Sequence, residues 1–183
     1  MNKRLPILVA ALSLTPILQG ANLRLEASVQ YFEPRDELFR AIYGGGAMTG
    51  AQVHIRVWKG LGLWIGGRRF SREGETTFTH ENIRVTVLPV AVGLDYRLKA
   101  GGFDLYAGAG LARFDYRETD ILGPGEVRKR SFGTVARAGN LVHPVPLLVI
   151  DFFLEYSSSR ITPVADEIQI GGVSTGVGIG VEF

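Results

Sequence analysis

The sequence predicts an all-β protein, an eight-stranded antiparallel up-and-down transmembrane β-barrel. Apolar and polar residues alternate with a period of two in eight runs, each long enough for a tilted strand that crosses a membrane. The segments between these runs alternate between short and long, and aromatic residues gather near the ends of the runs. These three features together are typical of small membrane barrels, which have an even number of strands.

The eight runs differ in how clearly they show their two faces. They comprise residues 23–32, 49–58, 61–70, 83–98, 102–116, 130–142, 147–157 and 168–183. In the first run, Leu25, Ala27 and Val29 share one face, and the polar residues share the other. The facing of the third run is ambiguous because Trp64 suits either side. Pro89 cannot donate to a ladder, so it predicts a bulge or locally weakened pairing in the fourth run.

The connections between runs sort into two kinds, as expected for long external loops and short periplasmic turns. The long connections are 33–48, 71–82, 118–129 and 158–167, and the short ones lie around 59–60, 99–101 and 143–146. Residues 36–43 suit a short helical turn in the first long connection. The glycines 44–46 that follow lack the strand and helix context of a phosphate loop, so we interpret them as a source of flexibility.

The N-terminus predicts a cleaved secretory signal peptide over residues 1–21, followed by one barrel domain over residues 22–183. Lys3 and Arg4 precede an apolar stretch at 5–18, and small residues follow at 20–21. The stretch is too short for a membrane-spanning helix. Cleavage after Ala21 removes two of 20 basic residues and none of 18 acidic ones, so the net charge falls from +2 to zero. The basic pI therefore does not indicate nucleic-acid binding.

Alternation alone also fits a soluble sheet, so the membrane assignment rests on the polar face. That face is rich in glycine, which suits the narrow interior of an eight-stranded barrel. It also carries charges of both signs, which must pair if they are buried. We therefore predict a lumen filled by ion pairs rather than an open pore. The candidates are Glu26, Arg56, Arg68, Arg97, Asp104, Arg137, Asp151, Glu155 and Glu182.

Two of these pairs follow from assumed turn positions. If the last short turn centres on Pro144, Arg137 lies directly opposite Asp151. If the middle turn centres between residues 100 and 101, Arg97 lies directly opposite Asp104.

The last run resembles the C-terminal signal that is read by the barrel assembly machinery of the outer membrane. The ending Gly-Val-Gly-Ile-Gly-Val-Glu-Phe places Val177, Ile179, Val181 and Phe183 on one face. The whole of residues 22–183 resembles the OmpA-like and OmpX-like outer membrane protein β-barrel domain family. The resemblance implies a small barrel in the outer membrane of a Gram-negative-type bacterium, without a periplasmic domain after Phe183. It implies no particular activity.

The residues provide little evidence for catalysis. The chain has no cysteine, and His54, His80 and His143 are scattered without metal-ligand spacing. Some small barrels modify lipid A, and the serines at 157–159 are candidate nucleophiles, with Glu155 and Tyr156 before them and His80 able to approach from a neighbouring loop. We therefore expect no enzyme activity, no cofactor and no metal site.

The sequence favours a structural or surface-interaction protein that acts through its external loops. The partners that we expect are outer-membrane lipid and lipopolysaccharide, the assembly machinery during biogenesis, and a surface ligand of unknown identity. A lipid A-modifying enzyme and a small-solute channel remain as alternatives. The charged loop residues behind this expectation are Arg35, Asp36, Glu37, Arg40, Arg72, Glu73, Glu75, Glu81, Glu118 and Asp120.

Overall fold

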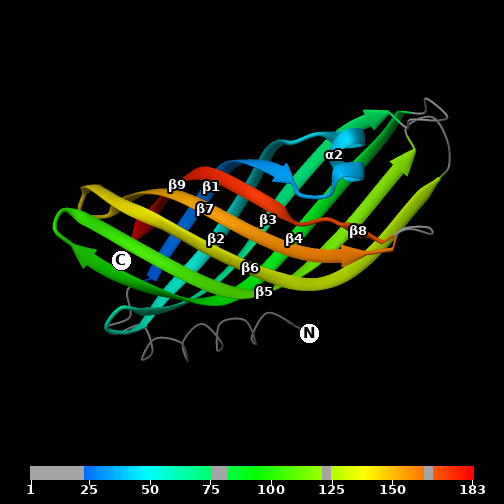
Figure 1. Ribbon diagram of the computed structural model, residues 1–183. Helices are drawn as coiled ribbons and strands as arrows, with labels where there is room; N and C mark the ends of the chain where they lie inside the picture. The colour runs from blue at the N-terminus through cyan, green and yellow to red at the C-terminus, as the bar shows by residue number, and fades with distance from the viewer. Residues whose placement is uncertain (1–22, 76–81, 121–124, 163–166) are drawn as a thin grey trace, which may run out of the picture.

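A computed structural model describes residues 23–75, 82–120, 125–162 and 167–183 and shows a closed antiparallel barrel (Figure 1). Its strands are β1 (Leu23–Pro34), β2 (Gly46–Trp58), β3 (Leu61–Glu75), β4 (Asn82–Ala100), β5 (Phe103–Asp120), β6 (Glu126–Val145), β7 (Leu148–Ile161), β8 (Ile168–Gln169) and β9 (Gly172–Glu182). Neighbours in sequence pair from β1 to β7, and β9 pairs with both β7 and β1. The predicted fold class is confirmed. The predicted signal peptide, His80 and Glu81 lie outside the described residues.

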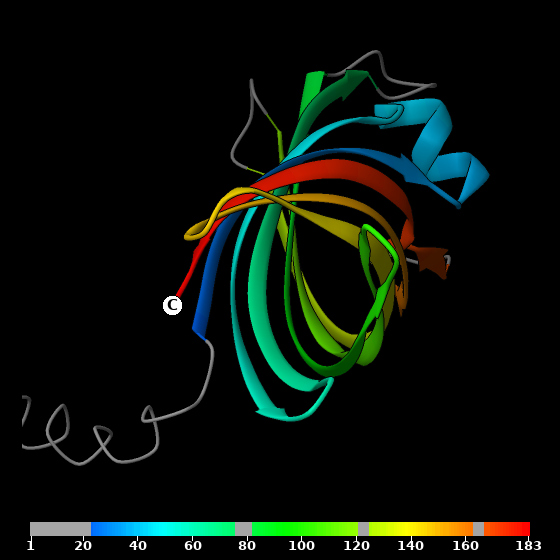
Figure 2. The same ribbon diagram turned by 90° about the vertical axis from the view of Figure 1, so that its left-hand side faces the viewer.

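The barrel wall has eight strands, and β8 lies apart from it (Figures 1 and 2). The predicted eighth strand therefore begins later than residue 168, because the chain first pairs β8 with the outer end of β7 and then enters the wall at Gly172. A side chain at Gly172 would meet the ring of Phe32 at 2.9 Å, so this entry into the wall requires glycine.

The predicted faces agree with the burial pattern along the strands. In β1 and β9, residues alternate strictly between exposed and covered, with Leu25, Val29 and Ile179 facing outward. Trp64 is 2 % exposed and points into the lumen, which settles the facing of β3. Pro89 causes no bulge. The β3–β4 ladder is interrupted opposite it and resumes in the same register, so the pairing is weakened, as expected.

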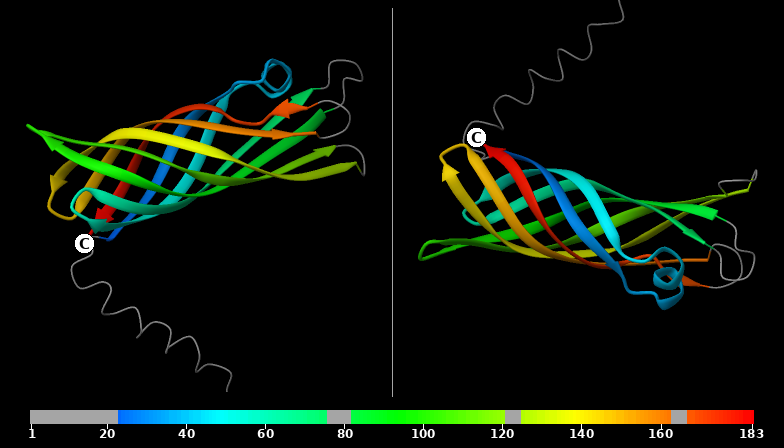
Figure 3. Two further views of the ribbon diagram at one scale, coloured as in Figure 1. Left: turned by 60° about the horizontal axis from the view of Figure 1, so that its bottom comes forward. Right: turned by 90° about the horizontal axis from the view of Figure 1, so that it is seen from above.

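At the end of the barrel opposite the short turns, the strands continue into segments that were predicted as long connections (Figure 3). We call this end of the barrel the extension. β3 reaches Glu75, and β5 and β6 fill most of the segment between 118 and 129. The alternation continues there with its faces exchanged: Ile83, Val85 and Val87 point inward, whereas Arg84 is exposed. Residues 71–75 and 126–129 belong to segments that were predicted as long connections. Ile83, Val85 and Val87 belong to the predicted fourth run, for which no exchange of faces was predicted.

The first long connection contains the expected helical turn, α2 (Glu37–Tyr43). Asp36 caps its N-terminus by accepting a hydrogen bond from the Phe39 amide at 3.0 Å, and Gly44 ends it with φ of +66°. No helix among the described residues has the length and apolarity to cross a membrane.

The two predicted cross-strand oppositions are wrong in register. Arg137 lies opposite Glu155, and Asp151 lies opposite Leu141, because the β6–β7 connection is centred two residues later than assumed and the ladder shifts between Val142 and Val145. In the other hairpin, Ala100 pairs with Phe103 around Gly101 and Gly102, which places Arg97 opposite Tyr106. Gly101 has φ of +61°, a conformation that glycine adopts without strain.

Candidate functional site: a closed lumen

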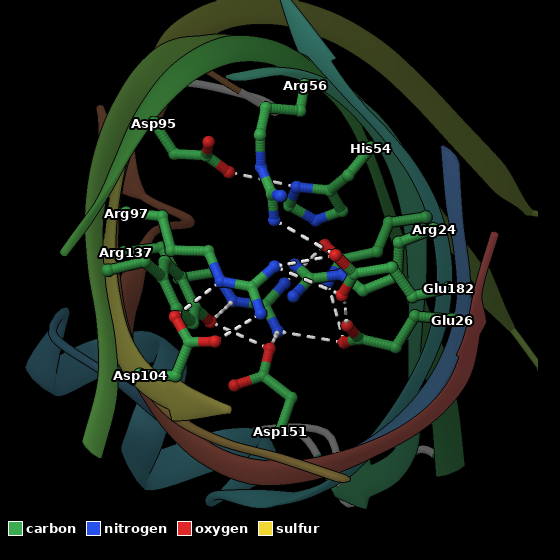
Figure 4. Close-up of polar contacts among 12 residues, drawn as sticks. Arg24, Glu26, His54, Arg56, Asp95, Arg97, Asp104, Arg137, Asp151 and Glu182 are labelled. Carbon is green, nitrogen blue, oxygen red and sulfur yellow. Dashed lines mark hydrogen bonds and ion pairs between the residues drawn. The ribbon is translucent and has the colours of Figure 1, made fainter. Parts of the chain in front are cut away.

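The lumen is filled along its length by three groups of inward-facing side chains. We call the end with the three short hairpin turns and the C-terminus the turn end. A charged cluster lies at this end, a second charged cluster lies in the middle, and apolar side chains fill the extension. Figure 4 looks along the lumen and shows the charged side chains from opposite walls converging on its axis.

Arg137 is the centre of the middle cluster. Its Nη2 lies 3.1 Å from Oε1 of Glu26 and 2.9 Å from Oδ2 of Asp151, and its Nε donates to the Tyr106 hydroxyl at 2.8 Å. Gln52 accepts a further hydrogen bond from Nη1 of Arg137 and donates to Glu26 at 2.6 Å. One guanidinium on β6 thus joins groups from four other strands, which fixes the middle of the barrel.

Two more arginines complete the middle cluster. Arg68 pairs with Glu155, and Nε of Arg24 lies 3.5 Å from Oε2 of Glu26. With Arg137 and Asp151, the cluster has three arginines and three carboxylates, and all six residues are at most 5 % exposed. Because an unpaired charge at such depth is costly, the balance of signs is what makes this interior tenable.

Glu182 and Arg97 organise the cluster at the turn end. Arg97 pairs with Asp104 and donates to both carboxylate oxygens of Glu182 at 2.8 and 3.0 Å. Arg56 donates to Glu182 at 2.9 Å, and Nε2 of His143 lies 3.3 Å from it. Glu182 comes from the last strand, so this cluster ties β9 to β2, β4 and β6 across the lumen.

His54 joins Asp95 beside this cluster, with Nδ1 of His54 2.9 Å from Oδ2 of Asp95. At the mouth of the turn end, Arg56, His143 and Glu182 line an open pocket of about 340 Å³. Further in, the free space beside Arg24, His54 and Asp95 is a cavity of about 30 Å³. That volume holds only about two water molecules. Beyond its mouth, the turn end of the lumen is thus occupied by side chains rather than by a water-filled path.

Apolar side chains close the lumen in the extension. Phe32, Phe70 and Phe114 are at most 2 % exposed, and the rings of Phe32 and Phe70 pack edge to face with centroids 5.1 Å apart. The helix α2 covers this packing with Phe39, whose ring lies 4.9 Å from that of Tyr43. Burial raises the pKa of the Tyr43 hydroxyl, and the charge of Glu118 raises it further.

All nine residues predicted for the lumen point inward, and each lies within 4.0 Å of an oppositely charged partner. Arg97 pairs with Asp104, and Arg137 pairs with Asp151, although neither pair is directly opposite in its ladder. Sequence reasoning did not list Arg24 or Asp95 as pairing candidates, although the alternation placed both on the polar face. The apolar plug was not predicted, because it inverts the alternation expected of a membrane-spanning strand, with apolar residues inside rather than outside.

The candidate nucleophiles lie at the outer end of β7. Ser157 and Ser159 point inward, where Ser157 accepts from the Gly172 amide and Ser159 donates to the Phe132 carbonyl, both at 3.4 Å. Ser158 accepts from the Gln169 amide group at 3.1 Å. His54 and His143 belong to the turn end. Within the described ranges, no group of three or more potential metal ligands comes together.

The residues of the predicted assembly signal lie on the outer face of the barrel. Val177, Ile179, Val181 and Phe183 are 46 %, 58 %, 38 % and 65 % exposed. The strand that bears them makes the closing pairing with β1. Trp58, Tyr96 and Phe103 are also exposed at the turn end. Tyr31 and Phe132 are exposed on the opposite side of the apolar band. Two girdles of aromatic residues, one on each side of an apolar band, are typical of membrane barrels.

Comparisons with known proteins agree with this architecture. No protein-family model matches the sequence, and no curated protein matches it. Among solved structures, OprG from Pseudomonas aeruginosa is similar at a TM-score of 0.70 and 13 % identity, with 89 % of this chain and 96 % of that chain covered. Neisserial surface protein A has a TM-score of 0.62 and 15 % identity, with 90 % of this chain and 98 % of that chain covered. Outer membrane protein W of E. coli has a TM-score of 0.56 and 12 % identity, with 89 % of this chain and 98 % of that chain covered. All three structures are outer-membrane barrels, so the fold is that of the small outer-membrane barrels.

Proposed function

We propose that the chain is an exported, non-enzymatic barrel of a Gram-negative-type outer membrane, and that it acts as a structural or surface-interaction protein. The apolar outer band between two aromatic girdles supports a location in a membrane. The predicted signal peptide over residues 1–21 and the outward-facing C-terminal residues support export and assembly there. The strands of the extension then present surface outside the membrane in segments that were predicted as long loops.

The observation that carries the proposal is the double closure of the lumen. Ion pairs fill its middle and turn end, and aromatic side chains beneath α2 fill its outer end. A small-solute channel needs a continuous wet path, and the two plugs favour a closed lumen instead. A serine hydrolase needs a base next to the nucleophile. The groups that bond the candidate serines are backbone and amide groups, which favours a structural role for these serines.

Heat-modifiable gel mobility and planar-bilayer recording test the proposal together. The mature protein in the outer-membrane fraction should migrate differently before and after boiling, as a folded barrel does. The same folded preparation, inserted into a planar bilayer, should give no steady conductance. Fractionation with soluble proteins would defeat the membrane assignment. Steady ion conductance from folded protein would defeat the closed-lumen assignment.

A measurement of lipid A structure tests the non-enzymatic part. Cells that express the protein and cells that lack it should give lipid A of the same mass distribution. A mass change that disappears with Ser157→Ala or Ser159→Ala would make the protein a lipid-modifying enzyme.

A further inference from the structure

The outer wall of the extension carries more arginines than carboxylates. Six arginines face outward on the four strands from β3 to β6, and Arg84 of β4 is paired with Glu73 of β3. We call the other five the arginine wall: Arg69, Arg113, Arg117, Arg128 and Arg130. Only two carboxylates in this wall face them. Asp115 lies between Arg113 and Arg130 at 2.8 and 2.9 Å, and Glu126 is shared by Arg117 and Arg128. The wall therefore has three more positive than negative charges.

One pairing in this wall opposes like charges. Arg117 on β5 and Arg128 on β6 are directly opposite each other in the ladder. Like charges in such positions destabilise a sheet. Glu126 hydrogen-bonds to both guanidiniums, and the bond from Arg128 lowers the pKa of Glu126 below its ordinary value. A single carboxylate for two guanidiniums leaves donors free for another anion.

The arginines also surround a hollow. A groove of about 660 Å³ lies at the wall. Its lining includes Thr86 and Leu88 of β4, the acidic Asp115, and Arg69, Arg117 and Arg130. It combines a small apolar surface with several forked donors. One guanidinium group can donate two parallel hydrogen bonds to two oxygens of a phosphate. This lining therefore suits a phosphorylated amphiphile better than a neutral or cationic one.

The position of the wall indicates where such a molecule would come from. On β5, Leu111 is the next outward residue below Arg113 and is 67 % exposed. On β6, Phe132 is the next outward residue below Arg130 and is 79 % exposed. The arginines thus directly border the apolar band, at the height where a bilayer changes from acyl chains to headgroups.

We propose that the arginine wall binds the phosphate groups of an anionic outer-leaflet glycolipid, lipid A, with its acyl chains lying against the apolar band below. This inference rests on the proposed outer-membrane location and adds the lipid class, the strands and the residues. Arg117 and Arg128 hold one phosphate between β5 and β6, and Arg69 approaches from β3 across the groove.

Quantitative lipid binding tests the proposal. Mature protein purified from outer membranes in detergent is delipidated and titrated with bisphosphorylated lipid A, and bound lipid is counted by native mass spectrometry. Arg117→Gln/Arg128→Gln should weaken binding by about tenfold or more, because two charge-assisted contacts are lost. The matched control, Arg40→Gln/Arg160→Gln, removes two exposed arginines outside the arginine wall and should bind like the parent.

Two further binding measurements distinguish a specific phosphate site from general electrostatic attraction between the protein and the lipid. Arg117→Lys/Arg128→Lys keeps the charge but loses the fork, so its affinity should fall between those of the parent and the Gln variant. Lipid A without phosphates should bind no better to the parent than to the Gln variant. Equal loss of binding in the Gln variant and in its control would overturn the proposal, as would full competition by inorganic phosphate at equal concentration.

The outcome is separable from that of the proposed function. Heat-modifiable mobility of each variant shows whether the barrel is folded. A folded, non-conducting barrel with unchanged lipid A binding in the Gln variant refutes the arginine wall as a lipid site and leaves the proposed function intact.

Discussion

Arg137 and Asp151 form an ion pair of 2.9 Å although they are not partners in the β6–β7 ladder. Gly139, the next inward residue after Arg137, lies between Tyr106 and Phe153 in the register. Its missing side chain leaves room for the guanidinium, which lies 3.8 Å from the centre of the Phe153 ring. The arginine thus extends along the lumen toward the turn end and reaches a carboxylate that belongs to a different rung.

Removing the hub of the middle cluster should destabilise the barrel strongly. Arg137→Met leaves the buried Asp151 without its counter-charge, and breaking such a pair costs about 3–5 kcal/mol. Arg137→Met/Asp151→Asn removes the orphaned charge and should regain much of this loss. Urea unfolding in lipid vesicles, followed by tryptophan fluorescence, measures both.

Arg113→Met is the control for that experiment. Arg113 pairs with Asp115 on the outer wall and is half-exposed, so its replacement should cost no more than about 1 kcal/mol. Equal costs for the two arginine variants would mean that the middle cluster contributes nothing beyond a surface pair.

Filling the space at Gly139 should also weaken the barrel. A Cβ there would lie 2.7 Å from the Tyr106 ring and 2.6 Å from the Phe152 carbonyl oxygen. Gly139→Leu should therefore cost at least about 1–3 kcal/mol through overpacking. The thermal midpoint of unfolding, read from gel mobility after stepwise heating, reports the change.

Gly67→Leu provides the matched glycine control. Gly67 also lies within a wall strand, but its nearest neighbour for an added Cβ is a Val90 methyl group at 3.9 Å. This variant should fold with a midpoint close to that of the parent. If its midpoint falls as far as that of Gly139→Leu, strand propensity rather than lumen space determines the effect.

The cap of α2 should determine how well the outer plug stays closed. One Asp36 oxygen accepts from the Phe39 amide and the other from the Gln169 amide, each at 3.0 Å. Asp36→Ala removes both bonds and should loosen the helix by about 1–2 kcal/mol. Asp36→Asn keeps one carbonyl acceptor, so its effect should be intermediate. Limited proteolysis between residues 34 and 46 measures the opening, and identical cleavage in all three proteins would contradict the capping role.

Phe183 should matter for assembly more than for stability. If the outward C-terminal face is the assembly signal, Phe183→Ala should lower the amount of heat-modifiable protein in the membrane of expressing cells. Phe103→Ala is the control, because Phe103 is similarly exposed, at 63 %, near the same end of the barrel. Equal loss in both variants would assign the effect to the girdle of exposed aromatic residues at this end and not to the assembly signal.

The alternation of apolar and polar side chains along the chain by itself determined the fold class. Leu25 and Ile179 face outward, and Glu26 and Asp151 inward, because neighbouring residues of a strand necessarily point to opposite faces. The same rule placed Arg24 and Asp95 on the polar face. It did not distinguish the membrane-spanning part from the extension, since Val85 and Val87 are apolar residues that the extension buries inside rather than outside.

The tertiary structure alone decided the register and the pairs. A shift of two residues in a hairpin turn leaves every face unchanged, so the sequence pattern contains no signal for it. The turns at Gly101 and before Leu148 determined these shifts and moved Arg137 from Asp151 to Glu155 as its ladder partner. The ion pair with Asp151 persists because the long arginine side chain spans the offset inside a narrow barrel. The sequence by itself therefore determined which charges the lumen contains, and the tertiary structure decided which of them meet.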